Sequence, residues 1–272
     1  MFFRLKRYVA PVTTAWQFRD LVYNMAQREV LSRYKGSWLG LVWTLVTPIL
    51  LLLVYMFVFG FIFKARWPQS SGVDEGFASL LFCGIIVYMM FSEVLNRSPR
   101  LIVDNVNYVK KVVFPIEILS WIAIVNALFH FSISCVVLLV FVFFSDKNFS
   151  WHLLYFPFLI ILFTLFLAGI SWFVSALGVY IRDVTYVAGF LTTALTFLSP
   201  VFYPKSIVPE RFAMIMDLNP LTFYIESFRQ IMVLGESPEF SAILIAAVIS
   251  VSVFFLGYWF FQRVKKGFAD VL

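Results

Sequence analysis

The chain has 272 residues, of which 62% are hydrophobic and only 13% are charged, and its mean hydropathy is +0.91. Because soluble chains average about 25% charged residues, this composition excludes an ordinary water-soluble domain and indicates an integral membrane protein. The net charge of +6 does not predict nucleic-acid binding, because the lysines and arginines stand beside apolar stretches, where retention at a membrane surface explains them.

Residues 1–37 form the predicted cytoplasmic N-terminal segment. Within it Phe18, Leu21, Val22 and Met25 recur at the spacing of one helix face, with polar side chains mostly on the opposite face. This pattern predicts an amphipathic helix that lies in the plane of the membrane interface or packs on the protein's own cytoplasmic loops. In either place a cytoplasmic partner can touch it.

Six apolar stretches follow, and all but a somewhat shorter fifth are long enough to cross a hydrocarbon layer of about 30 Å. They occupy residues 39–63, 77–95, 116–144, 153–181, 186–202 and 240–261. The predicted fold class is therefore all-α integral membrane. It has a six-span transmembrane domain at 38–262 and a cytoplasmic tail at 263–272.

Lysine and arginine are distributed unequally between the two sides that six spans define. Fifteen of them fall on the side of the two termini, and six fall on the other side. Since lysine and arginine are retained on the cytoplasmic side of a membrane, both termini are predicted to be cytoplasmic.

The loop between the second and third spans, RSPRLIVDNVNYVKKVVFPIE, is richer in structure-forming residues than a plain connector. Asp104 or Asn105 is predicted to cap a short helix that runs through Lys111, and Pro115 is predicted to open the third span. A short helix displayed in the cytoplasm suits docking into a groove on a partner. The alternative is that the basic residues only anchor the topology.

Residues that carry chemistry are scarce. No phosphate-binding loop, HExxH or GxSxG motif occurs, and both cysteines fall in apolar stretches, which predicts neither a disulfide framework nor a metal site. His130 and His152 are interpreted as structural histidines. Glu93 and Arg97 stand four residues apart and predict a local ion pair at the membrane interface.

Phenylalanine, tyrosine and tryptophan make up 20% of the chain. Most of these rings are expected to face lipid or to pack against one another. A minority are candidates to line a pathway, because ring faces suit the C–H faces of sugars while the sugar hydroxyls bond water. These candidate channel aromatics are Tyr55, Phe59, Tyr88, Phe91, Phe197 and Tyr203.

The segment between the fifth and sixth spans, residues 199–239, contains five prolines and apolar pieces too short to cross a membrane. It predicts re-entrant or interfacial half-helices. Pro220 is predicted to open one of them, with Asn219 as its N-cap. Glu226 and Arg229, three residues apart, are predicted to pair on its face in a structural role rather than to contact substrate.

Four stretches occur in order along almost the whole chain: QREVLSRYKGSWLGLVWTLVTPILLLLVYMFVFGFIF, KKVVFPIEILSW, GVYIRDV, and LSPVFYP followed by LNPLTFYIESFRQIMVLG. Together they resemble the permease subunits of ABC-2 type polysaccharide exporters. These are the O-antigen and capsular polysaccharide permeases (Wzm- and KpsM-like), with teichoic acid permeases as close relatives.

The resemblance implies a homodimer that pairs with two copies of a cytoplasmic ATPase encoded as a separate chain. ATP and magnesium would then be bound on that partner, and this chain would carry no cofactor. A coupling helix seated in the ATPase cleft would be formed by Asn105, Val106, Asn107, Tyr108, Val109, Lys110 and Lys111. The half-helices, with Asn219, Pro220, Glu226 and Arg229, would form a periplasmic gate region.

The implied substrate is a polysaccharide on undecaprenyl diphosphate, which would leave through a channel at the dimer centre. A basic rim of Arg28, Arg33 and Lys35 stands where the diphosphate head would enter from the cytoplasmic leaflet. Arginine is well shaped for phosphate oxygens. Topology and contact with anionic membrane lipids explain the same three residues equally well.

The predicted function is thus the transport subunit, not an enzyme, of an ATP-driven exporter of lipid-linked polysaccharide of the O-antigen or capsule type. Its predicted location is the bacterial inner membrane, as a multi-pass protein. The alternatives are an ABC-2 permease for teichoic acid, lipid or a drug and, less favoured, a membrane enzyme of glycan or lipid synthesis. Such an enzyme would usually show a carboxylate or histidine cluster at the interface, and the sequence shows none.

Overall fold

The computed structural model of the chain describes residues 11–62, 75–110, 114–144 and 150–272, and within these ranges the chain is helical without any strand. The α-helices are α2 (Arg19–Tyr34), α3 (Trp43–Tyr55), α4 (Glu75–Arg97), α5 (Val106–Lys110), α6 (Ile118–Phe144), α7 (Phe156–Tyr180), α8 (Val184–Leu198), α9 (Glu210–Leu218), α10 (Pro220–Arg229), α11 (Phe240–Val264) and α12 (Phe268–Val271). The 3-10 helices are η1 (Gly40–Val42), η3 (Ser98–Arg100), η4 (Val103–Asn105), η5 (Trp151–Tyr155), η6 (Lys205–Ile207) and η8 (Lys265–Gly267). The π-helical turns are η2 (Met56–Ile62) and η7 (Gln230–Leu234).

Five helical stretches of the described residues are long and apolar enough to cross a membrane. They are Gly40–Ile62, Gly76–Arg100, Ile118–Phe144, Trp151–Tyr180 and Phe240–Val271. The predicted fifth span corresponds to α8, whose 15 residues give a length of about 22 Å. The all-helical membrane architecture is therefore confirmed, with α8 as a shorter apolar helix beside five full-length ones.

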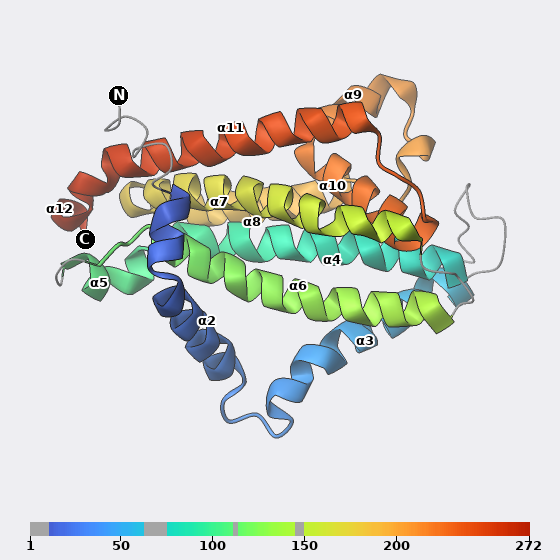
Figure 1. Cartoon of the computed structure of the whole chain (residues 1–272), viewed down its shortest axis with the longest axis horizontal. Helices are drawn as coiled ribbons and strands as arrows, with labels where there is room; N and C mark the ends of the chain where they lie inside the picture. The colour runs from blue at the N-terminus through green and yellow to red at the C-terminus, as the bar shows by residue number, and fades with distance from the viewer. Residues whose placement is uncertain (1–10, 63–74, 111–113, 145–149) are drawn as a thin grey trace.

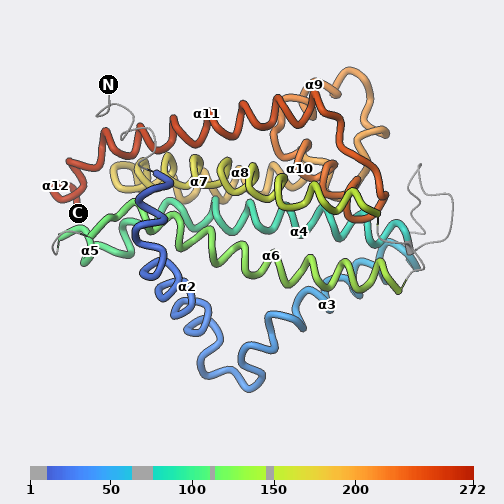
Figure 2. The backbone as a smooth tube through the Cα atoms, viewed as in Figure 1, coloured from blue at the N-terminus to red at the C-terminus, as the bar shows by residue number. Residues whose placement is uncertain are grey.

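The helix α4 is the centre of the bundle. Of its most apolar stretch 83% is buried, compared with 17–39% for the other four long stretches. It contacts α6, α7, α8 and α10. Figure 1 shows α6, α7 and α8 running alongside it, with α5 and α12 at one end of the bundle and α9 toward the other. The backbone path in Figure 2 makes the same separation of the two ends visible.

The helices α2 and α3 form a V whose tip points away from the bundle (Figure 1). The turn between them needs positive φ angles at Gly36 (89°) and Gly40 (53°), which glycine adopts without strain. On α2 the buried residues are Val22 and Ala26, and the helix contacts α6. The predicted amphipathic helix therefore packs on the membrane bundle itself.

The helices α7 and α11 pack more extensively than any other pair in the described chain. At Gly169 an added β-carbon would collide with the backbone of Val253, and at Gly257 it would collide with the backbone of Gly169. Small residues at a helix crossing allow this close backbone approach, which is the usual way that membrane helices associate.

An aromatic cluster fixes α7 against α6 and α11. Trp172 is fully buried, and its indole N–H donates to the carbonyl oxygen of Glu117 at 3.0 Å. Its ring packs against Trp121, Phe254 and Tyr258 at centroid distances of 5.8, 5.2 and 5.0 Å. The cluster buries large rings while it satisfies the one polar group of Trp172.

Candidate functional site

The predicted coupling segment forms η4 and α5 at the end of the molecule where α12 also lies, and α5 contacts α12 (Figure 1). Asn107, Tyr108 and Lys110 are exposed, whereas Val109 packs against the core. The Tyr108 ring stacks on Phe114 at 4.5 Å. A short helix with one anchored apolar side chain and three exposed polar or aromatic ones is suited to contact another protein.

The start of α5 differs in detail from the predicted cap. The Asn105 amide donates to the carbonyl of Leu101 at 2.9 Å, and Asp104 pairs with Arg100 at 3.5 Å. Both side chains therefore contact the preceding turn. Asn105 and Val106 are half-buried, and the predicted site residue Lys111 lies outside the described residues.

A polar cluster joins α2, α4 and α6. Glu93 of α4 lies 2.9 Å from the Arg33 guanidinium and 3.4 Å from Nδ1 of His130. The Tyr34 hydroxyl lies 3.1 Å from Nε2 of His130. The side chains of Glu93 and His130 are both largely buried. Burial of a polar or charged group costs free energy unless the group is bonded, so these contacts offset that cost and join α2 to the membrane bundle.

The predicted ion pair between Glu93 and Arg97 is wrong. Arg97 forms an ion pair with Glu29 of α2, and Glu93 forms one with Arg33 of α2. An i, i+4 pair gains only a few tenths of a kcal/mol, so partners brought in by α2 displace it. The interpretation of His130 as a structural histidine agrees with its contacts to Tyr34 and Glu93.

The polar cluster includes one of the three residues of the predicted basic rim, Arg33, and leaves out the other two. Arg28 and Lys35 are exposed, whereas the side chain of Arg33 is 47% exposed and already paired. A cavity of about 170 Å³ lies between α2, α3, α4 and α6, with Arg33 and His130 in its wall. Of the three predicted rim residues, two are therefore free of a carboxylate partner in the described chain.

The candidate channel aromatics fall into two groups. Tyr55 and Phe59 meet Phe202 at centroid distances of 6.3 and 6.4 Å, and Phe197 lies 6.3 Å from the same ring. The Tyr203 hydroxyl donates to the carbonyl of Phe197 at 2.5 Å. Phe197 is 65% exposed, so this group reaches the surface of the chain.

The other two candidates, Tyr88 and Phe91, are buried on α4 and lie 6.2 Å apart. The Tyr88 hydroxyl donates to the carbonyl of Thr192 and accepts from the hydroxyl of Thr196. These contacts join α4 to α8. Within one copy of the chain the two rings pack rather than line an open surface.

The half-helix α10 begins as predicted. Pro220 is its first residue, and the Asn219 side-chain oxygen accepts from the backbone N–H of Leu221 at 3.0 Å. The Asn219 amide also donates to the Ser199 hydroxyl at 2.8 Å. One side chain therefore caps α10 and fastens it to the end of α8.

Arg229 is fully buried at the end of α10. It donates to the carbonyls of Leu80 and Val201 at 2.8 and 2.7 Å and to Glu226 at 3.0 Å. A β-carbon at Gly84 would collide with its guanidinium. The predicted pair with Glu226 is confirmed, and the two carbonyl contacts agree with the predicted structural role.

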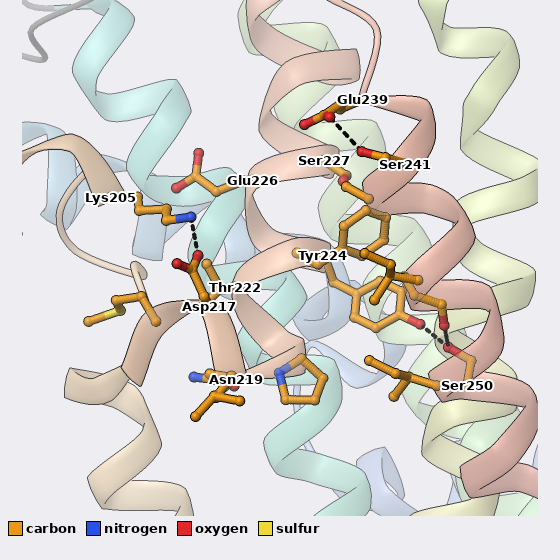
Figure 3. Close-up of a pocket in the computed structure, with 18 of the residues that line it drawn as sticks. Lys205, Asp217, Asn219, Thr222, Tyr224, Glu226, Ser227, Glu239, Ser241 and Ser250 are labelled. Carbon is orange, nitrogen blue, oxygen red and sulfur yellow. Dashed lines mark hydrogen bonds and ion pairs between the residues drawn. The ribbon is translucent and has the colours of Figure 1, made fainter. Parts of the chain in front are cut away.

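A cavity of about 550 Å³ lies between α9, α10 and α11 (Figure 3). In Figure 1 α9 lies toward the end of the bundle away from α5. Lys205 pairs with Asp217 at its mouth, and the Ser241 hydroxyl donates to Glu239 at 2.5 Å. The cavity was not predicted from the sequence, because its walls come from three helices that only the tertiary fold brings together.

Residues 20–233 match the model of the ABC-2 type transporter family, which is most of the chain. The chain belongs to the ABC-2 type transporter family. As a member of that family it is a transport subunit rather than an enzyme.

Three relatives of this ABC-2 transporter chain carry names that refer to export or transport. An O-antigen export system permease protein RfbA of Myxococcus xanthus is 27% identical and covers 95% of this chain and 98% of its own length. A protein of the same name from Klebsiella pneumoniae is 26% identical over 93% and 95%. The polysialic acid transport protein KpsM of Escherichia coli is 26% identical over 85% and 88%.

Proposed function

We propose that this ABC-2 chain is the membrane-spanning permease of an ATP-driven exporter that moves lipid-linked polysaccharide, of the O-antigen or capsule type, across a bacterial inner membrane. The observation that supports this most strongly is end-to-end similarity to permeases named for O-antigen export, over 95% of this chain and 98% of the relative. Similarity that covers the spans, the half-helices and the α5 segment alike supports a shared function for the whole chain rather than for one part of it.

The proposed topology has six spans, with α8 as the short fifth, between a cytoplasmic segment at 1–37 and a cytoplasmic tail at 263–272. The domain at 38–262 holds all the spans. The unequal distribution of lysine and arginine supports this orientation. It assigns the end that carries α5 and α12 to the cytoplasm and the end near α9 to the periplasm (Figure 1).

The proposed partner for ATP hydrolysis is a pair of cytoplasmic ABC ATPase subunits, which would also hold the ATP and magnesium. The coupling helix would be residues 105–111, with Tyr108 and Lys110 presented to the ATPase. Val109 packs against the core, so a displacement of α5 would be transmitted to the spans. This chain would perform no covalent chemistry.

A second copy of the chain is proposed to complete the pathway. The helix α8 exposes a stripe of large apolar side chains that includes Tyr186 (79% exposed), Phe190 (71%) and Phe197 (65%). The group of Tyr55, Phe59, Phe197 and Tyr203 adjoins this stripe. A channel between two copies would place these rings, rather than Tyr88 and Phe91, along the glycan.

The undecaprenyl-diphosphate head is proposed to enter at the basic rim, because Arg28 and Lys35 remain exposed at the cytoplasmic end. Phosphate oxygens accept hydrogen bonds from such cations at little desolvation cost at a membrane surface. Arg33 would contribute its half-exposed guanidinium while it remains bonded to Glu93. Anionic membrane lipids compete for the same residues.

The decisive experiment is reconstitution of the full chain with its ATPase in vesicles, followed by measurement of ATP-dependent glycan transport and of ATPase binding. We expect Lys110→Glu to weaken ATPase binding or stimulation by about tenfold. Arg182→Glu is the matched control, because Arg182 is exposed at another turn on the same proposed side. Transport of glycan by the chain without any ATPase would overturn the proposal, as would an ATPase that never binds.

A further inference from the structure

The start of α6 is held by three side chains that come from α7, α11 and η8. Both oxygens of the Glu117 carboxylate are bonded: Oε2 accepts from the Lys265 ammonium at 2.6 Å, and Oε1 accepts from the Gln262 amide at 3.4 Å. The backbone carbonyl of Glu117 accepts from the Trp172 indole at 3.0 Å. Glu117 therefore joins the start of α6 to α7 and to the end of α11 at the same time.

The ion pair between Glu117 and Lys265 is more than a surface contact. The side chain of Glu117 is 12% exposed, and that of Lys265 is 30% exposed. A hydrogen bond between charged groups is stronger than one between neutral groups, and removal of one partner leaves the other charge unpaired where water reaches it poorly. The pair therefore fixes where α6 begins relative to the end of α11.

The proposed coupling segment leads into this turn. The Tyr108 ring of α5, which is 36% exposed, stacks on Phe114 at 4.5 Å. Phe114 is followed by a tight turn, in which the backbone N–H of Ile118 donates to the carbonyl of Pro115 at 3.0 Å. A displacement of Tyr108 is therefore passed to Glu117 through one ring contact and one hydrogen-bonded turn of backbone.

The C-terminal segment makes a second link between α5 and the same two helices. The helix α12 contacts both α5 and α7, and it lies at the same end of the bundle as α5 (Figure 1). Phe268 of α12 is fully buried and packs on Tyr180 of α7 and Phe261 of α11, at centroid distances of 5.9 and 5.5 Å. The Tyr180 hydroxyl donates to the carbonyl of Val264 at 2.8 Å. Two separate sets of contacts thus fasten the coupling segment to α7 and α11.

We propose that Glu117 is a positioning residue for energy coupling: it holds the coupling segment against α7 and α11, so that a displacement of α5 by the ATPase moves these two helices. The inference rests on the proposed function, because it takes α5 as the contact with the ATPase. Glu117 acts through other residues and touches neither ATP nor glycan, since both of its carboxylate oxygens are bonded within the chain.

The first measurement tests whether the ion pair positions α5, and it needs no ATPase. Spin labels on Lys110→Cys and Ser252→Cys report the distance from α5 to α11 in nanodiscs, because both positions are exposed whereas the two native cysteines are buried. Ser252 lies about 18 Å along the α11 axis from Val264, within the range of pulsed EPR. We expect Lys265→Met to broaden the distance distribution at least twofold. Lys266→Met, at the exposed neighbouring residue, is the matched control and should leave the distribution unchanged.

The second measurement tests whether this position matters for transport. In vesicles that hold the chain and its ATPase, the readout is the glycan exported per ATP hydrolysed above the rate of the ATPase alone. We expect Glu117→Gln to lower this ratio at least fivefold, while the affinity for the ATPase stays within twofold, because the exposed face of α5 is unchanged. A variant that only unfolds part of the chain would lower export and stimulated hydrolysis together and keep the ratio.

An exchange of the two charges tests the ion pair itself. Glu117→Lys combined with Lys265→Glu reverses the pair, and the Gln262 amide can turn to accept a hydrogen bond from an ammonium at position 117. We expect this double variant to recover at least half of the parent's ratio of glycan to ATP. Lys265→Glu alone places two carboxylates together and should lose the ratio at least fivefold.

Three outcomes would overturn the inference. They are a parental distance distribution in Lys265→Met, a parental ratio of glycan to ATP in Glu117→Gln, and an exchanged pair that recovers no more than Lys265→Glu alone. Failure of the proposed function is a separate result, because it appears in the parent chain, which would then neither bind the ATPase nor export glycan. Failure of this inference appears only in the variants.

Discussion

Arg229 provides a sharp test of how the half-helices are held. Replacement by methionine keeps much of the side-chain length but removes every donor. The carbonyls of Leu80 and Val201 would lose their partner inside the protein, and Glu226 would keep its charge beside an apolar side chain. Breaking such a buried charged contact costs about 3–5 kcal/mol.

For a chain of this size each kcal/mol lowers the melting temperature by about 2–4 °C, so Arg229→Met should lower it by about 10 °C. The assay is the temperature at which half of the detergent-solubilised protein is no longer monodisperse. Arg211→Met is the matched control, because Arg211 is exposed on the neighbouring helix α9 and should change the melting temperature by about 1 °C or less.

A second variant tests the contacts of Arg229 from α4, the helix against which its guanidinium packs. Gly84→Ala would force a methyl group against the Arg229 guanidinium and should cost about 1–3 kcal/mol. Gly189→Ala, on α8, meets no described atom within 4 Å and should be neutral or slightly stabilising. If Arg229→Met melts within about 2 °C of the parent, Arg229 does not organise the half-helices, and the reasoning fails.

Two further predictions concern the core and the N-terminal helix. Trp172→Phe should lower the free energy of unfolding by at least about 1 kcal/mol more than Trp121→Phe does, measured in the same melting assay. The reason is that the indole N–H of Trp172 donates to the carbonyl of Glu117, whereas the buried indole N–H of Trp121 has no partner among described residues. Equal losses of stability would refute this. A double-mutant cycle of Arg33→Gln and Glu93→Gln should give a coupling of about 0.5–1 kcal/mol, since Arg33 is half-exposed, and a value near zero would show that the pair does not fasten α2.

Features set by neighbouring residues could be predicted from the sequence. The Asn219 cap, the Pro220 start and the Glu226–Arg229 pair all depend on residues within a turn of one another, and local rules describe them correctly. The long spans were predictable because about 20 apolar residues are needed to cross a bilayer, whatever their neighbours.

Features set by distant residues were not predictable. Arg229 bonds a carbonyl 149 residues away, and Glu93 prefers Arg33, 60 residues away, to Arg97 in the next turn. The ring of Phe202 was missed as the centre of the aromatic group, because its neighbours come from α3, η2 and α8. Tertiary contacts of this kind leave no periodic pattern in a single sequence.

The crossing of α7 and α11 limits how such a transporter can change shape. Because Gly169 and Gly257 bring the two backbones into contact, a slide of one helix over the other would drive side chains into main-chain atoms. The two helices are therefore expected to behave as a single lever throughout a transport cycle. Under the proposed function we expect opening to come from the less extensively packed helices α3 and α8, which would move relative to that lever while its own length and angle stay fixed.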